Sequence, residues 1–370
     1  MVWVVVIFVV YVAVAARPVP PETVLVPRWL SSPESGLPIA LGDGPARGVP
    51  ADYHAPLHFA LGNRFGYIAA DGSFPLNRVK TGRVSASPER WAEFGAEPES
   101  VTVYGPDGEA LFVIDEPGGY PFFLDGRVFV VGKGQNSVSE IDASGATLWT
   151  FEFSGQITVL DAAAGLLAAG SADGVVTVVD GSGRQVFSFE PGGSRFSVIA
   201  GIAVSGDGSR LAVVSGVDSQ RFLVLERFGD GAGYYRVVYH ESLGGGFRRP
   251  VHVVFVENDR HVVFERASGL GIYDVGSRIT RNVEAEGELR ALDGSGGHGL
   301  TFAVFSRGRA DSGASAAEEM ELVGIRIAGR SARVVTRAPF RSEDVFLGRM
   351  DSRLIVGGDR ALIAFDLERR

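Results

Sequence analysis

The sequence predicts an all-β protein built from a repeated unit. Three observations carry this prediction: short runs of β-branched and aromatic residues, tight-turn residues between the runs, and no sustained helical period from about Pro56 onward. Glycine supplies 50 of the 370 residues, and its usual share is only about 7%. Hydrophobic residues make up 45% of the chain, which is enough to build a substantial core.

The clearest repeat unit spans residues 125–153. It contains two β-rich runs, an Asp-Ala-Ser-Gly turn that begins at Asp142, and an aromatic third run. Residues 164–190 repeat the pattern, with an Asp-Gly-Ser-Gly turn that begins at Asp180, about 38 positions later. Glycine in such turns supplies the positive φ that tight hairpins need. A third copy precedes both at residues 103–114, and looser copies occupy residues 205–214, 261–275, 322–336 and 353–367.

Each unit reads as a small antiparallel sheet that buries too little surface alone, so copies must pack face to face in a closed ring. The sequence therefore predicts a single β-propeller over residues 56–370. Seven units across roughly 315 residues give about 45 residues each. We expect seven blades of four-stranded antiparallel sheets, with six or eight blades as alternatives. Residues 80–98 break the repeat and are expected to form an exposed insertion.

The last unit stops one strand short, at the C-terminus. An open ring would expose a sheet edge, so a segment from upstream of the first blade is expected to complete the final blade. Residues 23–30 are the best apolar candidate, and residues 54–61 are the alternative.

The N-terminus carries an uninterrupted apolar run from Val2 to Ala16. About 15 residues are too few to span a hydrocarbon core of ~30 Å comfortably, but this length suits a signal peptide. We expect residues 1–16 to be a signal peptide or a membrane anchor, and a buried strand is the third alternative. Residues 17–55 are dense in Pro and Gly and are expected to form a spacer, part of which closes the ring. This organisation predicts an extracytoplasmic protein, periplasmic or at the cell envelope, that is secreted or anchored.

Two segments resemble known repeat families. SGDGSRLAVVSG, residues 205–216, resembles the strand pair of WD40-like propellers. Residues 125–153 are similar to PQQ-like repeats, with Trp149 at the aromatic position. The resemblance covers most of residues 56–370 and implies a propeller architecture. It does not imply one biochemical activity.

The sequence shows no recognisable catalytic, cofactor or metal site. There is no cysteine and no Gly-x-Ser-x-Gly motif. His54 and His58 are four residues apart, but Pro56 between them opposes the helix that would bring them together. His252 and His261 flank one hairpin, and we expect them to form a structural pair. We therefore predict no cofactor and no metal.

The net charge of −9 without basic clusters argues against a nucleic-acid partner. Phe247, Arg248 and Arg249 follow three glycines on a loop, and this combination is typical of interface residues. We expect a non-enzymatic interaction scaffold with a protein partner at the cell envelope, bound to the membrane through residues 1–16 if they are retained. An envelope-assembly scaffold, similar to the PQQ-like propeller of outer-membrane protein insertion machinery, is a subtype. The alternative is a lactonase-like or hydrolase-like propeller enzyme with acidic and His residues at the central channel.

Overall fold

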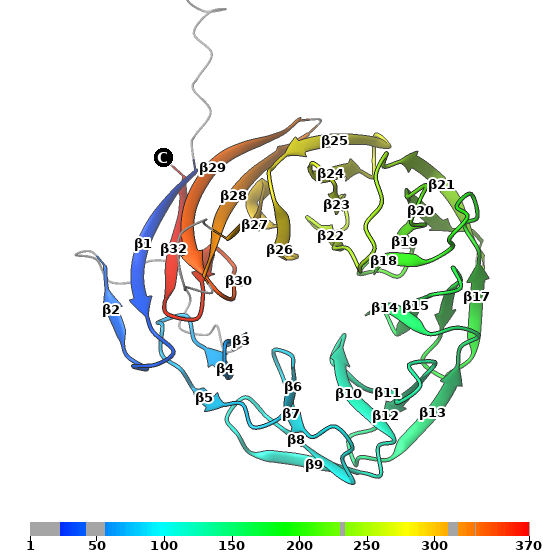
Figure 1. Ribbon diagram of the computed structural model, residues 1–370, viewed down its shortest axis with the longest axis horizontal. Coiled ribbons are helices and arrows are strands. Elements are labelled where there is room, and N and C mark those ends of the chain that lie inside the picture. The colour runs from blue at the N-terminus through cyan, green and yellow to red at the C-terminus, as the bar shows by residue number, and fades with distance from the viewer. Residues whose placement is uncertain (1–22, 42–55, 230–233, 310–316, 330, 370) are drawn as a thin grey trace, which may run out of the picture.

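The described residues form 32 β-strands in eight antiparallel sheets, arranged as blades around one central axis (Figure 1). This is a computed structural model, and it describes residues 23–41, 56–229, 234–309, 317–329 and 331–369. We number the blades 1 to 8, starting from the sheet that begins at Leu57. Because residues 1–22 lie outside the described residues, the N-terminal apolar run and its fate stay a prediction. Among the described residues, no helix is long and apolar enough to cross a membrane.

The inner strands, nearest the axis, of blades 1 to 8 are β3 (Leu57–Leu61), β6 (Arg83–Ala86), β10 (Gly119–Leu124), β14 (Ile157–Ala163), β18 (Ile199–Val204), β22 (Val253–Val256), β26 (Glu288–Leu292) and β30 (Phe346–Met350). The middle strands are β4 (Arg64–Ile68) in blade 1, β7 (Trp91–Phe94) and β8 (Ser100–Tyr104) in blade 2, β11 (Arg127–Gly132) and β12 (Ser137–Ile141) in blade 3, and β15 (Leu166–Ser171) and β16 (Val176–Val179) in blade 4. In the second half of the ring they are β19 (Arg210–Ser215) and β20 (Arg221–Arg227) in blade 5, β23 (His261–Arg266) and β24 (Gly269–Asp274) in blade 6, β27 (Leu300–Arg309) and β28 (Glu318–Ala328) in blade 7, and β31 (Arg353–Gly357) and β32 (Leu362–Arg369) in blade 8. The outer strands of blades 1 to 7 are β5 (Leu76–Val79), β9 (Ala110–Asp115), β13 (Thr147–Glu152), β17 (Gln185–Phe189), β21 (Tyr235–Ser242), β25 (Ile279–Glu284) and β29 (Ser331–Ser342). One short 3₁₀ helix, η1 (Gly297–Gly299), precedes β27.

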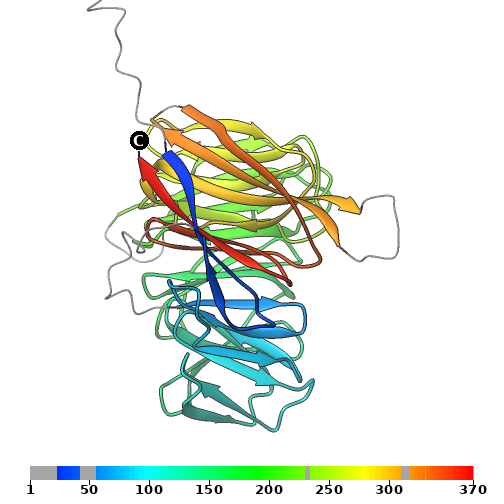
Figure 2. The ribbon, with the colours of Figure 1, turned by 90° about the vertical axis from the view of Figure 1, so that its left-hand side faces the viewer.

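The ring is closed by the N-terminal strand β1 (Thr23–Ser31), which pairs antiparallel with β32 from the C-terminus. Figures 1 and 2 show β1 in blue beside β32 in red. The short strand β2 (Pro38–Ala40) adds a fifth strand outside β1. The sequence placed the closing strand at residues 23–30, and this pairing confirms it. The alternative fails, because residues 57–61 form the inner strand of blade 1.

The predicted count of seven four-stranded blades is wrong. The structure has eight blades: blade 1 has three strands, blade 8 has five, and the other six have four. The expected insertion at residues 80–98 contains β6 and β7, the first two strands of blade 2. The strands of blade 1 and these two strands are only four or five residues long. Runs this short show too few alternations between apolar and polar residues to mark a repeat.

The core is divided among the blade interfaces. Eight buried apolar clusters lie within the described residues, and each joins residues of two neighbouring blades. Blades 4 and 5 share Val178 and Leu223, for example, and the closing interface between blades 8 and 1 shares Ile355 and Phe59. Every blade therefore depends on both neighbours to bury its faces, which is why the ring must close.

The repeated Asp-x-Ser-Gly turn has a physical role in this packing. The carboxylate of Asp142 accepts hydrogen bonds from the amides of Ser144 and Ala146, and Asp180 does the same in the next blade. The turn glycine then packs on the preceding blade. Gly183 has a φ of +79°, and a Cβ there would lie 2.6 Å from Cγ of Trp149. The indole Nε1 of Trp149 donates to the Gly181 carbonyl at 3.2 Å. The motif therefore caps one hairpin and docks it on the previous blade.

Buried charges also hold the closure. Asp366 on β32 accepts from Nε of Arg28 on β1 at 2.7 Å and from Nε of Arg353 on β31 at 2.7 Å. Arg353 is almost fully buried and also donates to the Ala70 carbonyl of blade 1 at 2.6 Å. Two guanidinium groups thus share one buried carboxylate, so the last blade is joined to both the N-terminal strand and blade 1.

Candidate functional site

An apolar cleft lies between the loop that joins blade 4 to blade 5 and the loop that joins blade 5 to blade 6. Its volume is about 520 Å³, within the range of ligand pockets. Most of its lining side chains are apolar: Thr158, Phe196, Val198, Ile199, Ala200, Val217, Phe247, Arg248, Arg249 and Pro250. They come from the two loops, the inner strands β14 and β18, and the β19–β20 turn.

Two phenylalanines stand on the loops that form the walls of the cleft. Phe196 is 59% exposed, and Phe247 is half-buried against the core shared by blades 5 and 6. The guanidinium of Arg195 lies 5.9 Å from the Phe196 ring, and that of Arg249 lies 4.9 Å from the Phe247 ring. Aromatic and arginine side chains exposed together on loops are typical of interface centres.

The first wall is held in place by Ser194. Its hydroxyl donates to the carboxylate of Asp218 on the β19–β20 turn, and it accepts from the amide of Phe196 at 3.3 Å. Asp218 also accepts from the amide of Arg195 at 3.2 Å. The hydrogen bond from Ser194 is the largest cause of the lowered pKa of Asp218. The loop is thus tied to blade 5.

The second wall is held by the same turn. Gln220 is buried, and its side-chain oxygen accepts from the amide of Phe247 at 3.4 Å. The backbone carbonyl of Gln220 accepts from the amide of Leu243 at 2.9 Å. Both walls therefore rest on the β19–β20 turn, and their spacing is set by the blade itself.

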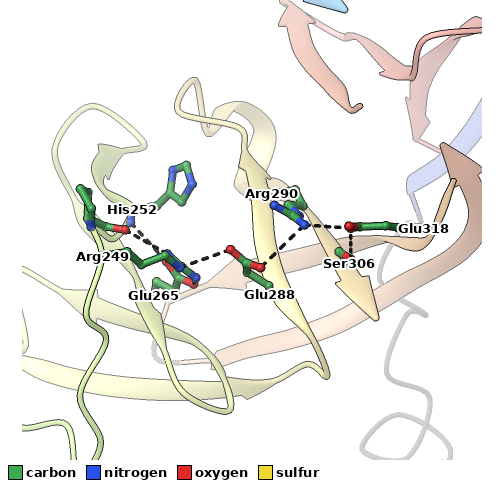
Figure 3. A network of polar contacts seen from close by, with 8 residues as sticks. Arg249, His252, Glu265, Glu288, Arg290, Ser306 and Glu318 are labelled. Carbon is green, nitrogen blue, oxygen red and sulfur yellow. Dashed lines mark hydrogen bonds and ion pairs between the residues drawn. The ribbon is translucent and has the colours of Figure 1, made fainter. Parts of the chain in front are cut away.

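An extended network of charges runs from the cleft to blade 7 (Figure 3). Arg249 donates to both carboxylate oxygens of the buried Glu265, at 2.6 and 3.1 Å, and its Nε lies 3.3 Å from Glu288. Arg290 then bridges Glu288 and Glu318, at 3.7 and 2.8 Å. A bidentate pair with a buried carboxylate fixes the arginine. Arg249 is therefore a structural residue of the cleft wall as well as part of its lining.

The cleft adjoins a second pocket, which lies along the inner strands of blades 3 to 6 and is here called the channel mouth, because Thr158 lines both. The channel mouth has a volume of about 520 Å³. Its lining combines apolar and aromatic side chains, from Tyr120 and Phe122 on β10 to Val253 on β22, with an exposed surface that is about as polar as it is apolar. Polar side chains in this lining are Gln135, Thr158 and His252.

One acidic group on an inner strand has a perturbed pKa. Burial raises the pKa of Asp161 on β14 to about 6, and a hydrogen bond from the Val204 amide, at 2.7 Å, opposes this shift. The bond joins the inner strands of blades 4 and 5. Asp161 therefore has a structural role that accounts for its position.

The structure brings the three predicted contact residues together. Phe247, Arg248 and Arg249 all line the cleft, and Arg248 is exposed at its edge. Their role in partner contact stays a prediction. Among the described residues, no group of three or more His, Cys, Asp or Glu side chains is placed to hold a metal ion.

The predicted histidine pair is wrong. His261 pairs with Val256 across the hairpin, whereas His252 lies beyond the other end of β22. The extended strand separates them, and Nε2 of His261 instead lies 3.1 Å from the carboxylate of Asp274. His58 is part of β3, and His54 lies outside the described residues.

Sequence reasoning missed the opposite wall of the cleft, which carries Phe196. A signal was present, because both inter-blade loops share one composition. Residues 191–196 read PGGSRF and residues 244–249 read GGGFRR, so glycines precede Arg and Phe in each. The two loops start successive blades, and equivalent loops of neighbouring blades lie side by side in a propeller.

Comparison with known proteins agrees with this architecture. A family model described as a beta-propeller protein matches residues 1–369. The chain belongs to this β-propeller family. An uncharacterized protein of Treponema pallidum (strain Nichols) is 32% identical over 309 residues, which cover 80% of this chain and 81% of the relative.

Three solved structures share the fold at low sequence identity. BamB from Moraxella catarrhalis has a TM-score of 0.54 and 14% identity, covering 84% of this chain and 95% of BamB. A chain of the mitotic checkpoint complex has a TM-score of 0.54 and 16% identity, and the match covers 89% of this chain and 98% of that chain. The computationally designed Ika8 protein has a TM-score of 0.58 and 16% identity, and the match covers 85% of this chain and 97% of Ika8. The fold-level resemblance to WD40-like and PQQ-like repeat propellers is confirmed.

Proposed function

We propose that the protein is a non-enzymatic interaction scaffold that binds another protein through the apolar cleft between blades 4, 5 and 6. The observation that carries the proposal is the pair of loop phenylalanines, Phe196 and Phe247, held apart by a shared turn over an apolar floor. Unlike a single exposed apolar residue, Phe196 and the half-buried Phe247 continue the apolar floor of the cleft, and a contiguous apolar surface of this kind gains free energy when a partner covers it. A preorganised cleft also lowers the entropy lost on binding.

The pocket at the channel mouth, which residues of blades 3 to 6 line, supports a scaffold over an enzyme. A propeller hydrolase needs acidic or His side chains that converge on one channel mouth. Among the residues that line this pocket, the titratable side chains are Tyr120 and His252, and none is a carboxylate. A chain of the mitotic checkpoint complex shows the same fold within a protein assembly. It is a precedent for the fold and does not identify the partner.

We also propose that the scaffold acts outside the cytoplasm, at the cell envelope. This part of the proposal rests on the apolar run from Val2 to Ala16 and the Pro-rich stretch that follows it. Mass spectrometry of the N-terminus in membrane and soluble fractions tests it. A retained run in the membrane fraction indicates an anchor, and a processed N-terminus indicates secretion. An intact N-terminus in the cytoplasmic fraction would contradict the proposal.

Affinity purification from the native cell, after crosslinking, tests the scaffold. We expect a stoichiometric protein partner with the wild-type protein and its loss with Phe196→Ser or Phe247→Ser. Leu148→Ser is the matched control, because Leu148 is 57% exposed on β13 of blade 3. Each variant is first shown to melt like the wild type. A partner retained by both Phe variants, or lost equally with the control, would contradict the proposed site.

A further inference from the structure

We infer that the cleft recognises an extended polypeptide segment in which an apolar side chain is flanked by carboxylates. This inference rests on the proposed function and names the chemistry of the partner. It combines two features of the same site: an apolar floor with aromatic walls, and cationic groups at its edges.

The floor and walls select the apolar side chain. Ile199, Ala200, Val198 and Val217 line the cleft between the two phenylalanine rings. None of these groups offers a side-chain hydrogen bond. A polar side chain placed there would lose its water without compensation, whereas a leucine or phenylalanine gains by leaving water.

The edges select negative charge. Arg195 and Arg248 are exposed beside the cleft, and neither guanidinium has an ion-pair partner among the described residues. No acidic side chain lines the cleft. Asp218 lies nearby and stays negatively charged, because its hydrogen bonds come from the neutral Ser194 hydroxyl and the Arg195 amide, and Arg249 is shared by Glu265 and Glu288. The exposed guanidinium groups of Arg195 and Arg248 place positive charge at the outer edges of the cleft, where it attracts carboxylates.

The shape favours a continuous chain over a compact molecule. The cleft joins the channel mouth at Thr158, where Val159, Leu160 and Ile202 extend the apolar surface. A segment seated between the phenylalanines can continue along this surface, and its flanking residues then face Arg195 and Arg248. A single acyl chain would fill the apolar part but would meet only one of the two cationic edges, so we favour a polypeptide.

Fluorescence anisotropy with labelled synthetic peptides tests this chemistry on the purified full-length protein. The probe has a central Leu-Phe pair flanked by aspartates. Matched peptides replace the aspartates with lysines or the Leu-Phe pair with serines, and a medium-chain fatty acid is a separate competitor. We expect the acidic apolar peptide to bind at least fivefold more tightly than either matched peptide at low salt, with weaker binding at high salt.

Charge reversal at one edge locates the effect. We expect Arg248→Glu to weaken binding of the acidic peptide several-fold and to strengthen binding of the lysine peptide. Arg360→Glu, which makes the same charge change at an 81% exposed side chain on the β31–β32 turn, should alter neither. Equal binding of the acidic and lysine peptides, an equal effect of the two variants, or displacement by the fatty acid alone would overturn the inference. If Phe196→Ser still abolishes capture of the cellular partner in that case, the proposed function stands and only this chemistry fails.

Discussion

Replacing Asp366 with alanine is expected to lower the free energy of unfolding by about 3 to 5 kcal/mol, the usual cost of removing one partner from a buried ion pair. The side chain of Asp366 is 6% exposed, and that of Arg353 is 1% exposed. In the variant, Arg353 keeps its bond to the Ala70 carbonyl but loses both bonds to the carboxylate. Arg28 keeps its contact with Glu368. Two guanidinium groups then face each other across the closing blade with no charge between them.

The loss of stability should appear as a lower melting temperature. The unfolding entropy of a 370-residue chain is about 0.8 kcal/mol/K, from about 2.1 cal/mol/K per residue, so a cost of 4 kcal/mol corresponds to about 5 °C. Calorimetry measures both the melting temperature and the unfolding entropy. Asp366→Asn keeps one acceptor oxygen and should lower the melting temperature by less than Asp366→Ala does. It provides a second measurement if the alanine variant does not fold.

Glu319→Ala is the matched control for the loss of a carboxylate. Glu319 pairs with Arg341 at 3.1 Å, but these side chains are 48% and 67% exposed. An exposed pair contributes about 0 to 1 kcal/mol, so this variant should melt within about 1 °C of the wild type. If Asp366→Ala melts as close to the wild type as Glu319→Ala does, the buried carboxylate does not hold the closure, and the reasoning is refuted.

Three further predictions address packing, titration and the cleft. Gly183→Ala should lower the free energy of unfolding, measured by urea titration, by about 1 to 3 kcal/mol, because the new Cβ meets the Trp149 indole and the backbone has a φ of +79°. It should also change the near-ultraviolet circular dichroism of Trp149. Gly118→Ala, at a φ of +63° with no neighbour within 4 Å, should show the backbone cost alone in the same urea titration. The pKa of Asp161 rises from 3.8 to about 6 on folding, so the folded state binds more protons in this window and stability falls as the pH rises through it. Asp161→Asn should remove this slope and stabilise the protein at pH 7 by up to about 3 kcal/mol, and equal slopes in urea melts from pH 4 to 7 would contradict this. Ser194→Ala should speed hydrogen exchange in the loop that carries Phe196 while changing global stability by less than about 1 kcal/mol, and unchanged exchange would mean that Ser194 does not hold this loop.

The sequence predicted the propeller where its turns follow a pattern. The turns at Asp142 and Asp180 mark blades 3 and 4, because each combines a side-chain cap with a glycine of positive φ. The closing strand at residues 23–30 was predictable for a different reason: a ring cannot leave a sheet edge open. Blade 1 was missed because its strands are four or five residues long.

The candidate site was predictable only in part. Phe247, Arg248 and Arg249 follow three glycines and stand out in the sequence, but Phe196, which also lines the cleft, lies about 50 positions earlier. Its proximity depends on the packing of neighbouring blades. The pairing of Arg249 with Glu265 and of Arg353 with Asp366 was beyond sequence reasoning, because charged residues on strands are normally exposed.

Photocrosslinking from position 247 in the native cell is the most direct test of the central claim that the cleft binds a partner protein. A photoreactive phenylalanine analogue replaces Phe247, and a second variant carries it in place of Leu148, which is exposed on blade 3. We expect one discrete crosslinked protein from position 247, in a yield that Phe196→Ser lowers, and none of that protein from position 148. The same crosslinked protein from both positions, or no crosslink from position 247, would contradict it.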